Sequence, residues 1–499
     1  MSKVTINRLE TGVPGLDQIL GGGLPEFSFN LIGGKPGCGK TTLAHQLMFA
    51  MASDERPALY FTVLGESALK MLRYQQQFDF FDPGKINHAI HFVNLSAEAA
   101  AGDLDQVTSR IAAEVQAHGP ALVFVDSFRS IVRASTTHEN KLQQFMQELG
   151  MLLTSWQATT FLVGEYSTEA DANPIVTLAD GLLWLHQSVQ RNSMVRKIEI
   201  LKMRAQAILP GIHTFRISQS GVQVFPPATQ AADEVGDRGP NSLGEGKDQV
   251  PEDSRLLVGV PELDEMLGGG LPSGYSLLVA GPSGSGKTIL AASFLAEGAR
   301  AGETGVVAVF EQNPHRSRNR ILIDLISAGK VALIDSRSPD LSIDEIVLEI
   351  MREVKRLKAT RVVIDSLSGF ELSIAPTFHT DFRESMARMV HALASTGVTV
   401  LMTSELEDRY ADLRFSPYGT AFLTDAIIVQ RYIELDSRLQ RLMAVVKVRG
   451  SAHSDELRLF SIDGDGIHLG PTLPGHVGLL GGRPSHEHYS EFSAPSTKP

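Results

Sequence analysis

The chain has 499 residues, a length that domains of about 150 residues would divide into two or three parts. Hydrophobic residues make up 43% and charged residues 20%, which is ordinary for a globular protein and excludes disorder as the main state. The formal net charge of -12 argues against an overall basic field for nucleic acid but leaves a local basic groove open, and the single cysteine excludes an internal disulfide. The sequence shows neither an apolar signal core nor an apolar stretch near ~18 residues, so we expect a cytoplasmic protein without a membrane anchor.

The most informative feature is that one pattern occurs twice along the chain. GVPGLDQILGGGLP at 12–25 recurs as GVPELDEMLGGGLP at 259–272, an offset of 259 − 12 = 247 residues. Three further pairs follow in the same order: GGKPGCGKTTL at 33–43 with AGPSGSGKTIL at 280–290, VFVDS at 123–127 with VVIDS at 362–366, and LKMR at 201–204 with VKVR at 446–449. Chance does not preserve the order of four landmarks, so we predict two homologous domains.

The segment between the copies has the composition of a flexible acidic linker. Residues 226–254 contain seven acids and two bases with few apolar residues, so they hold 2 − 7 = −5 of the net charge. The end of the chain, 476–499, is rich in Gly, Pro, Ser and His and predicts a disordered tail. We therefore expect an N-terminal domain at 1–225 and a C-terminal domain at 255–475.

Within each copy, short apolar segments alternate with longer helical patterns, which predicts an α/β fold with a mostly parallel sheet flanked by helices. The expected strands are 27–32, 58–63, 121–126, 159–164 and 181–185, then 275–280, 305–310, 361–365, 398–403 and 426–430. The expected helices include 41–52, 104–117 and 141–156, then 288–300, 343–357 and 381–396. Antiparallel hairpins are expected from the alternating segments 442–448, 456–461 and 466–469.

Each copy contains the pattern GxxxxGK(S/T), which is typical of phosphate-binding loops. The pattern consists of Gly34, Lys35, Pro36, Gly37, Cys38, Gly39, Lys40 and Thr41, followed by Thr42, and of Gly281, Pro282, Ser283, Gly284, Ser285, Gly286, Lys287 and Thr288, followed by Ile289. Each loop follows an expected strand and opens an expected helix, so its N–H groups and the positive helix end should converge on phosphates. Lys40 and Lys287 would reach the β- and γ-phosphates, and the hydroxyls of Thr41 and Thr288 would bind Mg²⁺.

An aspartate ends an apolar strand after each of these loops. An acid at a strand end is common by itself, but after a phosphate loop the carboxylate of Asp126 or Asp365 would hold a Mg²⁺-bound water. The sequence therefore predicts Thr41 with Asp126, and Thr288 with Asp365, as the metal-binding residues.

With these motifs in place, the sequence resembles the KaiC family of RecA-like ATPases. The resemblance rests on TGVPGLDQILGGGLP and its counterpart ahead of the phosphate loops, the VFVDS and VVIDS strands, and the ending KVRGSAHSDELRLF. It covers roughly residues 8–225 and 254–470. It implies two tandem RecA-like P-loop domains, ATP and Mg²⁺ as cofactors, and a two-tiered hexamer with ATP between neighbouring subunits. Regulatory protein partners are expected, and a nucleic-acid partner is not.

The resemblance also implies that two Lys-x-Arg pairs reach the γ-phosphate bound by a neighbouring subunit. The pairs are Lys202 with Arg204 and Lys447 with Arg449. A cation delivered there stabilises the charge that develops during phosphoryl transfer. Each pair alternates along a strand-like segment and should point to one side. The alternative is a solvated strand face.

A departure from the family concerns the glutamates. Related clock proteins carry two adjacent glutamates at the end of the second central strand, placed to activate the attacking group. By alignment, each copy keeps one glutamate of the pair: the second copy keeps the first of them, Glu311, which is the better placed base, whereas the first copy has Gly65 there and keeps only Glu66. We therefore expect the C-terminal domain to hydrolyse ATP faster and the N-terminal domain to bind ATP mainly to hold the ring together. A nucleotide sensor without hydrolysis is the alternative.

A second departure concerns autophosphorylation, for which the clock protein uses an adjacent Ser-Thr pair just before a Thr-Asp. Alignment on Thr424 and Asp425 places Ala421 and Phe422 at the pair, and neither can accept a phosphate. The nearby hydroxyls that could substitute are Ser416, Thr420 and Thr424. The sequence thus predicts a Mg²⁺-dependent, KaiC-like ATPase in regulation or signalling. A serine/threonine autokinase of the clock type is one alternative, and a RecA-like DNA-dependent ATPase, disfavoured by the acidity, is the other.

Overall fold

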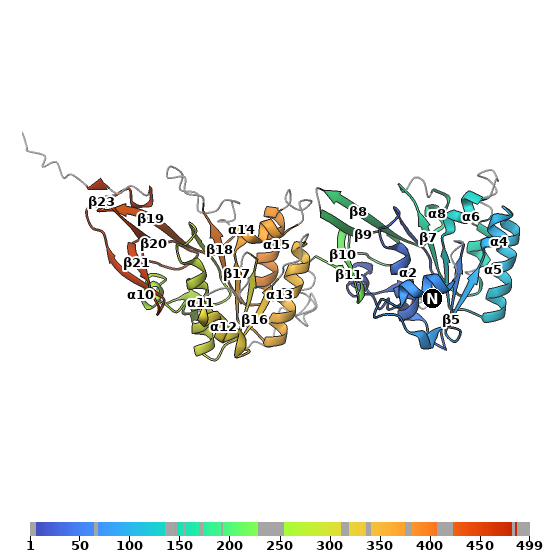
Figure 1. Ribbon diagram of the computed structural model, residues 1–499, viewed down its shortest axis with the longest axis horizontal. Helices are drawn as coiled ribbons and strands as arrows, with labels where there is room; N and C mark the ends of the chain where they lie inside the picture. The colour runs from blue at the N-terminus through green and yellow to red at the C-terminus, as the bar shows by residue number, and fades with distance from the viewer. Residues whose placement is uncertain are drawn as a thin grey trace, which may run out of the picture. The chain divides into compact units, whose positions relative to one another are not determined.

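The chain forms two compact units, Met1–Pro227 and Ala228–Pro499. The computed structural model describes residues 6–63, 68–134, 145, 147–152, 155–168, 173–190, 193–227, 254–310, 319–335, 341–374, 382–406, 423–481 and 485–486. Each unit contains one nine-stranded sheet (Figure 1). The division between the units falls inside the segment predicted as a linker, most of which lies outside the described residues. In the described part of the chain, no helix is both long and apolar enough to cross a membrane.

The first unit alternates strands and helices along the chain. Its strands are β1 (Arg8–Leu9), β2 (Leu24–Pro25), β3 (Phe29–Gly34), β4 (Ala58–Thr62), β5 (Ile90–Asn94), β6 (Leu122–Asp126), β7 (Thr159–Glu165), β8 (Gly181–Gln190), β9 (Ser193–Met203), β10 (Ile212–Ser218) and β11 (Gly221–Phe225). Its helices are α1 (Leu16–Leu20), α2 (Lys40–Met51), α3 (Ala68–Gln75), α4 (Ser96–Ala100), α5 (Leu104–His118), α6 (Phe128–Ala134) and α8 (Asn173–Leu178), with a 3-10 turn at Pro83–Lys85.

The second unit repeats the order of the strands that form the large sheet. Its strands are β12 (Arg255–Leu256), β13 (Leu271–Pro272), β14 (Ser276–Gly281), β15 (Gly305–Val309), β16 (Val331–Asp335), β17 (Arg361–Asp365), β18 (Thr399–Glu405), β19 (Ala426–Leu435), β20 (Arg438–Val448), β21 (Leu457–Ile462), β22 (Ile467–Thr472), β23 (His476–Val477) and β24 (Ser485–His486). Its helices are α10 (Pro261–Met266), α11 (Lys287–Arg300), α12 (Arg320–Ser327), α13 (Ile343–Leu357), α14 (Leu367–Ser373) and α15 (Phe382–Ser395), with a 3-10 turn at Leu479–Gly481.

The two large sheets have the same strand order. In the first, β8-β3-β7-β6-β4-β5 pair in parallel and β9, β10 and β11 extend the sheet in antiparallel fashion from β8. In the second, β19-β14-β18-β17-β15-β16 are parallel and β20, β21 and β22 are antiparallel. The predicted α/β fold, with two tandem domains that end in hairpins, is confirmed. In this fold, the strand before each phosphate loop, β3 or β14, lies inside the sheet.

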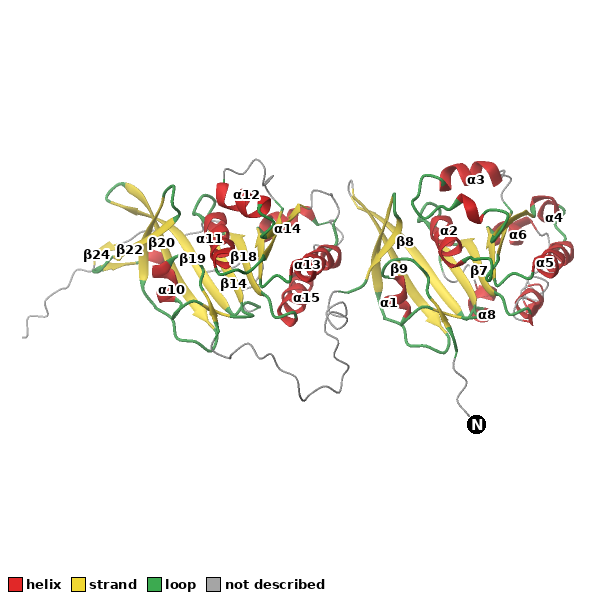
Figure 2. Ribbon diagram, turned by 90° about the horizontal axis from the view of Figure 1, so that it is seen from below, coloured by secondary structure: helices red, strands yellow, loops and turns green. Residues whose placement is uncertain are grey.

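Successive residues of the central strands supply two separate apolar layers, because side chains alternate between the faces of a sheet. Leu31 and Phe61 pack in the layer of Ile111 from α5, whereas Ile32 packs in the layer of Leu47 from α2. The second unit divides in the same way, with α13 and α15 in one layer and α10 and α11 in the other. Helices therefore cover both faces of each sheet (Figure 2).

The structure extends the predicted elements in several places. The sequence does not predict β5 and β16, because five-residue strands carry little periodicity. It ends β8 and β19 five residues too early, since the continuing residues are partly polar and pair in hairpins. Of the helix expected at 141–156, residues 145, 147–152 and 155 are helical, residue 156 lies in a turn, and the others lie outside the described residues.

The sequence predicts a disordered tail from His476, and the structure differs at its start. Strand β23 pairs with β24, and the 3-10 turn between them buries Leu479 against Ile433 and Leu442 of the β19–β20 hairpin. Leu479, together with the partly buried Leu480 beside it, thus attaches a Gly- and Pro-rich segment to the sheet by removing apolar surface from water. The remainder of the tail lies outside the described residues.

A buried ion pair fixes the start of β17. The Arg361 side chain is 2% exposed, and its Nε donates to Glu303 at 2.6 Å. The guanidinium also donates to the carbonyls of Leu257 and Phe294, at 2.7 and 2.8 Å. This single side chain connects β17, α11 and the segment after β12, and its burial requires that the charge stay paired.

We expect Glu303→Ala to lower the free energy of unfolding by about 3 kcal/mol, because it leaves a buried guanidinium without its carboxylate. Urea unfolding followed by circular dichroism measures the change. Glu353→Ala is the control, since it removes an exposed helix-surface pair with Arg356 and should cost less than about 0.5 kcal/mol. Equal effects of the two substitutions would contradict a special role for the buried pair.

Candidate functional site

The two phosphate loops connect the same elements in each unit. Strand β3 ends at Gly34 and α2 begins at Lys40, while β14 ends at Gly281 and α11 begins at Lys287. Within the described part of the chain, no side chain caps either helix at its N-terminus. The first-turn N–H groups of α2 and α11 thus remain available to an anion at the end of the loop.

The last glycine of each loop also permits close packing by a hairpin strand. Gly39 and Gly286 have φ values of 106° and 104°, a conformation that glycine tolerates best. A Cβ atom on Gly39 would lie 2.6 Å from the Cδ1 of Ile217 in β10, and one on Gly286 would lie 2.5 Å from the Cδ1 of Ile462 in β21. The appended hairpins therefore support the phosphate loops directly.

Each loop lysine points into its own loop. The ammonium of Lys40 donates to the carbonyl of Lys35 at 2.8 Å. The ammonium of Lys287 donates to the carbonyls of Gly281 and Pro282, both at 2.8 Å. Phosphate oxygens would replace these carbonyls as partners and would bring opposite charge to the ammonium.

Cys38 lies buried within the first loop. Burial raises the pKa of its thiol, so the neutral and unreactive form is favoured. Ser285 takes its place in the second loop, where the hydroxyl donates to Oε1 of Gln430 at 2.9 Å. Both positions are interior contacts of the loop, which fits a packing role.

In the first unit, the structure brings together the two residues predicted to bind the metal. The Thr41 hydroxyl donates to Oδ2 of Asp126 at 2.7 Å, and the Tyr60 hydroxyl donates to the same oxygen at 2.8 Å. Asp126 is buried, and this burial raises the pKa of its carboxyl, although the two hydroxyl bonds act in the opposite direction. A divalent cation would favour the ionised carboxylate further.

In the second unit, the aspartate occupies the same position with a different partner. Asp365 ends β17, as Asp126 ends β6. Among the described residues, it accepts its hydroxyl bond from Thr403 of β18 and not from Thr288. Thr288 is exposed at the start of α11.

The oxygen atoms at these positions fit Mg²⁺ bound together with a nucleotide. Mg²⁺ at such sites keeps several waters and takes only one or two protein ligands besides the phosphates. In keeping with this, the described residues contain no group of three or more His, Cys, Asp or Glu side chains that could hold a metal alone. Thr41 with Asp126, and Thr288 with Asp365, supply a hydroxyl and a carboxylate in each unit.

The two glutamates predicted as bases, Glu66 and Glu311, lie outside the described residues. Two other glutamates lie beside the loops and are missed by sequence reasoning. Glu165 ends β7 in register with Gly34, and Glu405 ends β18 in register with Gly281. The sequence signal is that a glutamate follows the predicted strands 159–164 and 398–403, at Glu165 and Glu405. This signal becomes informative only when these strands are known to lie beside β3 and β14, which lead into the phosphate loops.

The Lys-x-Arg pair of the first unit lies at the edge of the sheet opposite the phosphate loop. Met203 at the end of β9 pairs with Gly181, which pairs with Asn30 near the beginning of β3. The loop begins only after Gly34. At about 3.3 Å per strand residue, roughly 15 Å separate the two ends, so Arg204 lies far from the phosphates of its own loop.

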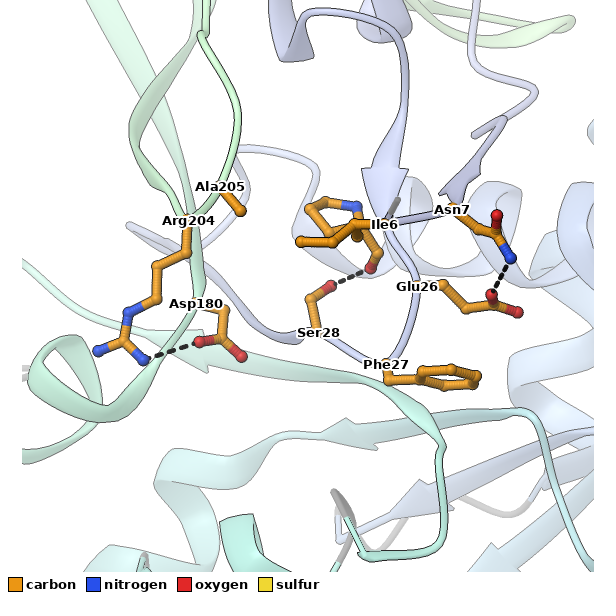
Figure 3. A pocket seen from close by; sticks show the side chains of 9 residues that line it. Ile6, Asn7, Glu26, Phe27, Ser28, Asp180, Arg204 and Ala205 are labelled. Atoms are coloured by element: carbon orange, nitrogen blue, oxygen red, sulfur yellow. Dashed lines mark hydrogen bonds and ion pairs between the residues drawn. The ribbon is translucent and has the colours of Figure 1, made fainter. Parts of the chain in front are cut away.

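An aspartate holds Arg204 at this edge. The guanidinium donates to Oδ1 of Asp180 at 2.9 Å, and Oδ2 of Asp180 accepts the N–H of Phe29 at 3.0 Å. Arg204 is 58% exposed, so the ion pair is accessible to solvent. The pair lies beside a cavity of about 360 Å³ lined by Ile6, Asn7, Pro25, Glu26, Phe27, Ser28, Asp180, Arg204 and Ala205. Figure 3 shows the bond from Arg204 to Asp180.

The second unit repeats this arrangement. Arg449 donates to Oδ1 of Asp425 at 3.2 Å, and Oδ2 of Asp425 accepts the N–H of Ser276 at 3.0 Å. Arg449 is 60% exposed. Both arginines lie one residue beyond a strand end, whereas the lysines of the pairs belong to β9 and β20.

The lysines of the two pairs also contact their own unit. Lys202 donates to the carbonyl of Val176 at 3.3 Å, and Lys447 donates to that of Thr424 at 2.6 Å. Partial burial, reinforced by the neighbouring arginine, lowers the pKa of both ammonium groups. The duplicated contacts place two cations together at the same edge of each sheet.

A buried histidine lies behind Tyr60. The rings of His45 and Tyr60 are 4.7 Å apart, and the His45 side chain is completely buried. Burial lowers the pKa of His45 from 6.5 to about 4, so the imidazole is neutral in the folded protein at neutral pH. The second unit has Ala292 at this position, since 292 − 45 = 247.

Comparison with known proteins places both units in one family. The family model described as "ATPase: KaiC" matches residues 9–229 and 256–473. The circadian clock oscillator protein KaiC of Rippkaea orientalis is 25% identical over 497 residues, which cover 96% of this chain and 92% of the relative. KaiC 1 of Synechocystis sp. is 25% identical (98% and 94% covered), and KaiC3 of the same organism is 27% identical (97% and 96% covered).

Protonation of His45 should make the first unit sensitive to acid. Its pKa is lower in the folded state than in the unfolded chain, so its contribution is intact above about pH 6.5 and is lost as the pH falls towards 4. The expected loss is up to roughly 3 kcal/mol over this window. Denaturant unfolding between pH 4 and pH 7 measures it, with His45→Ala as the comparison. A variant with the same pH slope as the parent would contradict this origin.

Proposed function

Because the chain belongs to the KaiC family of ATPases, we propose that it is a Mg²⁺-dependent, ATP-hydrolysing ring protein that acts in regulation or signalling. One observation carries the proposal: in both units, the phosphate loop and the Lys-x-Arg pair lie at opposite edges of one sheet. A single unit with this arrangement can bind ATP but cannot bring its own arginine to the γ-phosphate in its own loop. A neighbouring copy of the chain can do so.

The residues around each loop would have separate roles in ATP binding and ATP turnover. Loop N–H groups and Lys40 or Lys287 would bind the phosphates, and Thr41 or Thr288 would contact Mg²⁺, with Asp126 or Asp365 holding a metal-bound water. Bound Mg²⁺ would supply charge neutralisation at the β- and γ-phosphates. This assignment is supported by the hydroxyl–carboxylate contact in the first unit and by the placement of both loops.

The Lys-x-Arg pairs would act across subunit interfaces. Arg204 and Arg449 are more than half exposed and are held by ion pairs that a stronger anion can displace. A surface that gives an arginine to one neighbour and receives one from the other is a head-to-tail interface, and such interfaces close into rings when the rotation permits. The hexamer is the ring expected from the family resemblance.

We propose further that the C-terminal domain is the more active ATPase. The support is the retained Glu311, assigned by alignment as the base that activates water, where the first domain has Gly65. The N-terminal domain would use bound ATP mainly to hold the ring together. Regulatory protein partners would receive the signal.

The autokinase alternative receives no support from the described residues. Thr424 is completely buried, and its carbonyl accepts Lys447. A buried hydroxyl cannot meet a phosphate donor without local opening. The other hydroxyls named from the sequence, Ser416 and Thr420, lie outside the described part of the chain, as do Ala421 and Phe422.

Lys287→Ala is expected to remove most ATP turnover, whereas Lys40→Ala should leave most turnover and weaken the ring. The reason is that each substitution deprives one loop of its phosphate-binding cation. Phosphate release measures turnover, and size-exclusion chromatography with and without ATP measures assembly. Undiminished turnover in the Lys287→Ala protein would contradict the proposal that the C-terminal domain is the more active ATPase.

Arg449→Ala should lower the turnover of the C-terminal domain by about 100-fold while leaving ATP affinity within about twofold, because the arginine is remote from its own loop and acts on developing charge. Steady-state kinetics and equilibrium binding of a fluorescent ATP analogue separate the two quantities. Arg356→Ala is a matched control, since that arginine is also 60% exposed and paired with a carboxylate. Lost affinity at unchanged turnover would refute the assignment.

A further inference from the structure

A buried tyrosine holds the metal-binding aspartate of the first unit and has no counterpart in the second. Tyr60 lies on β4, is completely buried, and donates its hydroxyl to Oδ2 of Asp126 at 2.8 Å. The duplication places Val307 of β15 at the equivalent position, since 307 − 60 = 247. We propose that Tyr60 is a positioning residue that orients Asp126 for Mg²⁺, in the N-terminal domain alone; the inference rests on the proposed function.

The second unit supports its aspartate from the other side. Asp365 accepts the hydroxyl of Thr403 on β18, a neighbour of β17. In the first unit, the residue in the same register of β7 is Val163, because Ile32 pairs with Val163 as Val279 pairs with Thr403. Each domain therefore has one hydroxyl and one valine on the two strands that flank the strand of the aspartate. The hydroxyl is on β4 in the first unit and on β18 in the second, and the valine is on the other flanking strand.

This reciprocal exchange indicates that a hydroxyl beside the aspartate is required and that its source is not fixed. A carboxylate at the end of a buried strand needs a donor to hold one orientation, and a hydrogen bond to a charged group is among the stronger ones. Tyr60 and Thr403 supply that donor from opposite neighbours. The valines at the other positions fill the space without a polar group.

The surroundings of Tyr60 leave its hydroxyl little freedom. Its ring lies 4.7 Å from that of His45, 5.5 Å from Phe92 and 6.0 Å from Phe124. A ring enclosed in this way keeps its position before any ligand binds, so its hydrogen bond costs little additional order. Tyr60 is thus a rigid support for the carboxylate.

Thr41 shares the same carboxylate oxygen and cannot give equal support. Its hydroxyl donates to Oδ2 of Asp126 at 2.7 Å, but the loop pattern assigns that hydroxyl to Mg²⁺. When Thr41 turns to the metal, the bond from Tyr60 remains. The tyrosine would therefore keep Asp126 oriented in the bound state, as residues behind metal ligands commonly do.

The test uses Lys287→Ala protein, in which the first loop alone is intact, and a fluorescent ATP analogue as the probe. Tyr60→Phe should raise the Mg²⁺ concentration for half-maximal probe binding by about tenfold. Binding of the probe in EDTA should stay unchanged, because the phosphate contacts do not involve Tyr60. An unchanged Mg²⁺ requirement would overturn the inference. Failure of the Lys287→Ala parent itself to bind the probe would instead contradict the proposed function.

A matched control separates this role from general packing. Tyr166→Phe makes the same chemical change at a buried tyrosine whose hydroxyl has no hydrogen-bond partner among the described residues, and it should not alter the Mg²⁺ requirement. Thr403→Val in Lys40→Ala protein is the reciprocal variant and should shift the requirement of the second loop. If Tyr60→Phe fails to fold, Thr403→Val tests the same role of a hydroxyl beside the aspartate. Equal shifts from Tyr60→Phe and Tyr166→Phe would show that packing alone is responsible and would refute the inference.

Discussion

The direction of the parallel strands is the constraint on which the rest of the structure depends. Parallel pairing sends the carboxyl ends of β3, β6 and β7 to one edge, where the phosphate loop, Asp126 and Glu165 meet. The antiparallel turn from β8 to β9 then returns the chain to the other edge and leaves Arg204 there. The second unit repeats both halves of this arrangement. The strand order thus places the loop lysine and the arginine of each unit at opposite edges of one sheet. A neighbouring subunit would have to supply the arginine that acts at each loop.

The duplication keeps the scaffold and varies what surrounds the chemistry. Both phosphate loops pack against an isoleucine of a hairpin strand. Both arginines pair with an aspartate that also accepts a backbone N–H of the strand before the loop, β3 or β14. The residues behind the two strand-end aspartates differ, because Tyr60 donates its hydroxyl to Asp126 and Thr403 donates its hydroxyl to Asp365. Such differences can tune the two domains separately without a change in fold.

The sequence predicts much of this site, because glycine-rich loops, strand-end acids and duplicated order are local signals. It cannot predict the partnership of Tyr60 with Asp126, which depends on β4 and β6 being neighbours, or the register that brings Glu165 beside Gly34. It also misses the attachment of Leu479 and Leu480, since two adjacent apolar residues in a Gly-rich segment show no periodicity. The roles of Glu66 and Glu311 remain predictions from alignment.

Complementation between subunits tests the central claim most directly. Lys287→Ala subunits and Arg449→Ala subunits each lack one half of the second site, so an equal mixture assembled with ATP should restore an intact site at about a quarter of the interfaces of a head-to-tail ring. Turnover above the sum of the two unmixed proteins is the predicted result. A mixture that shows only that sum, while mass spectrometry confirms mixed rings, would contradict the action of Arg449 across the interface.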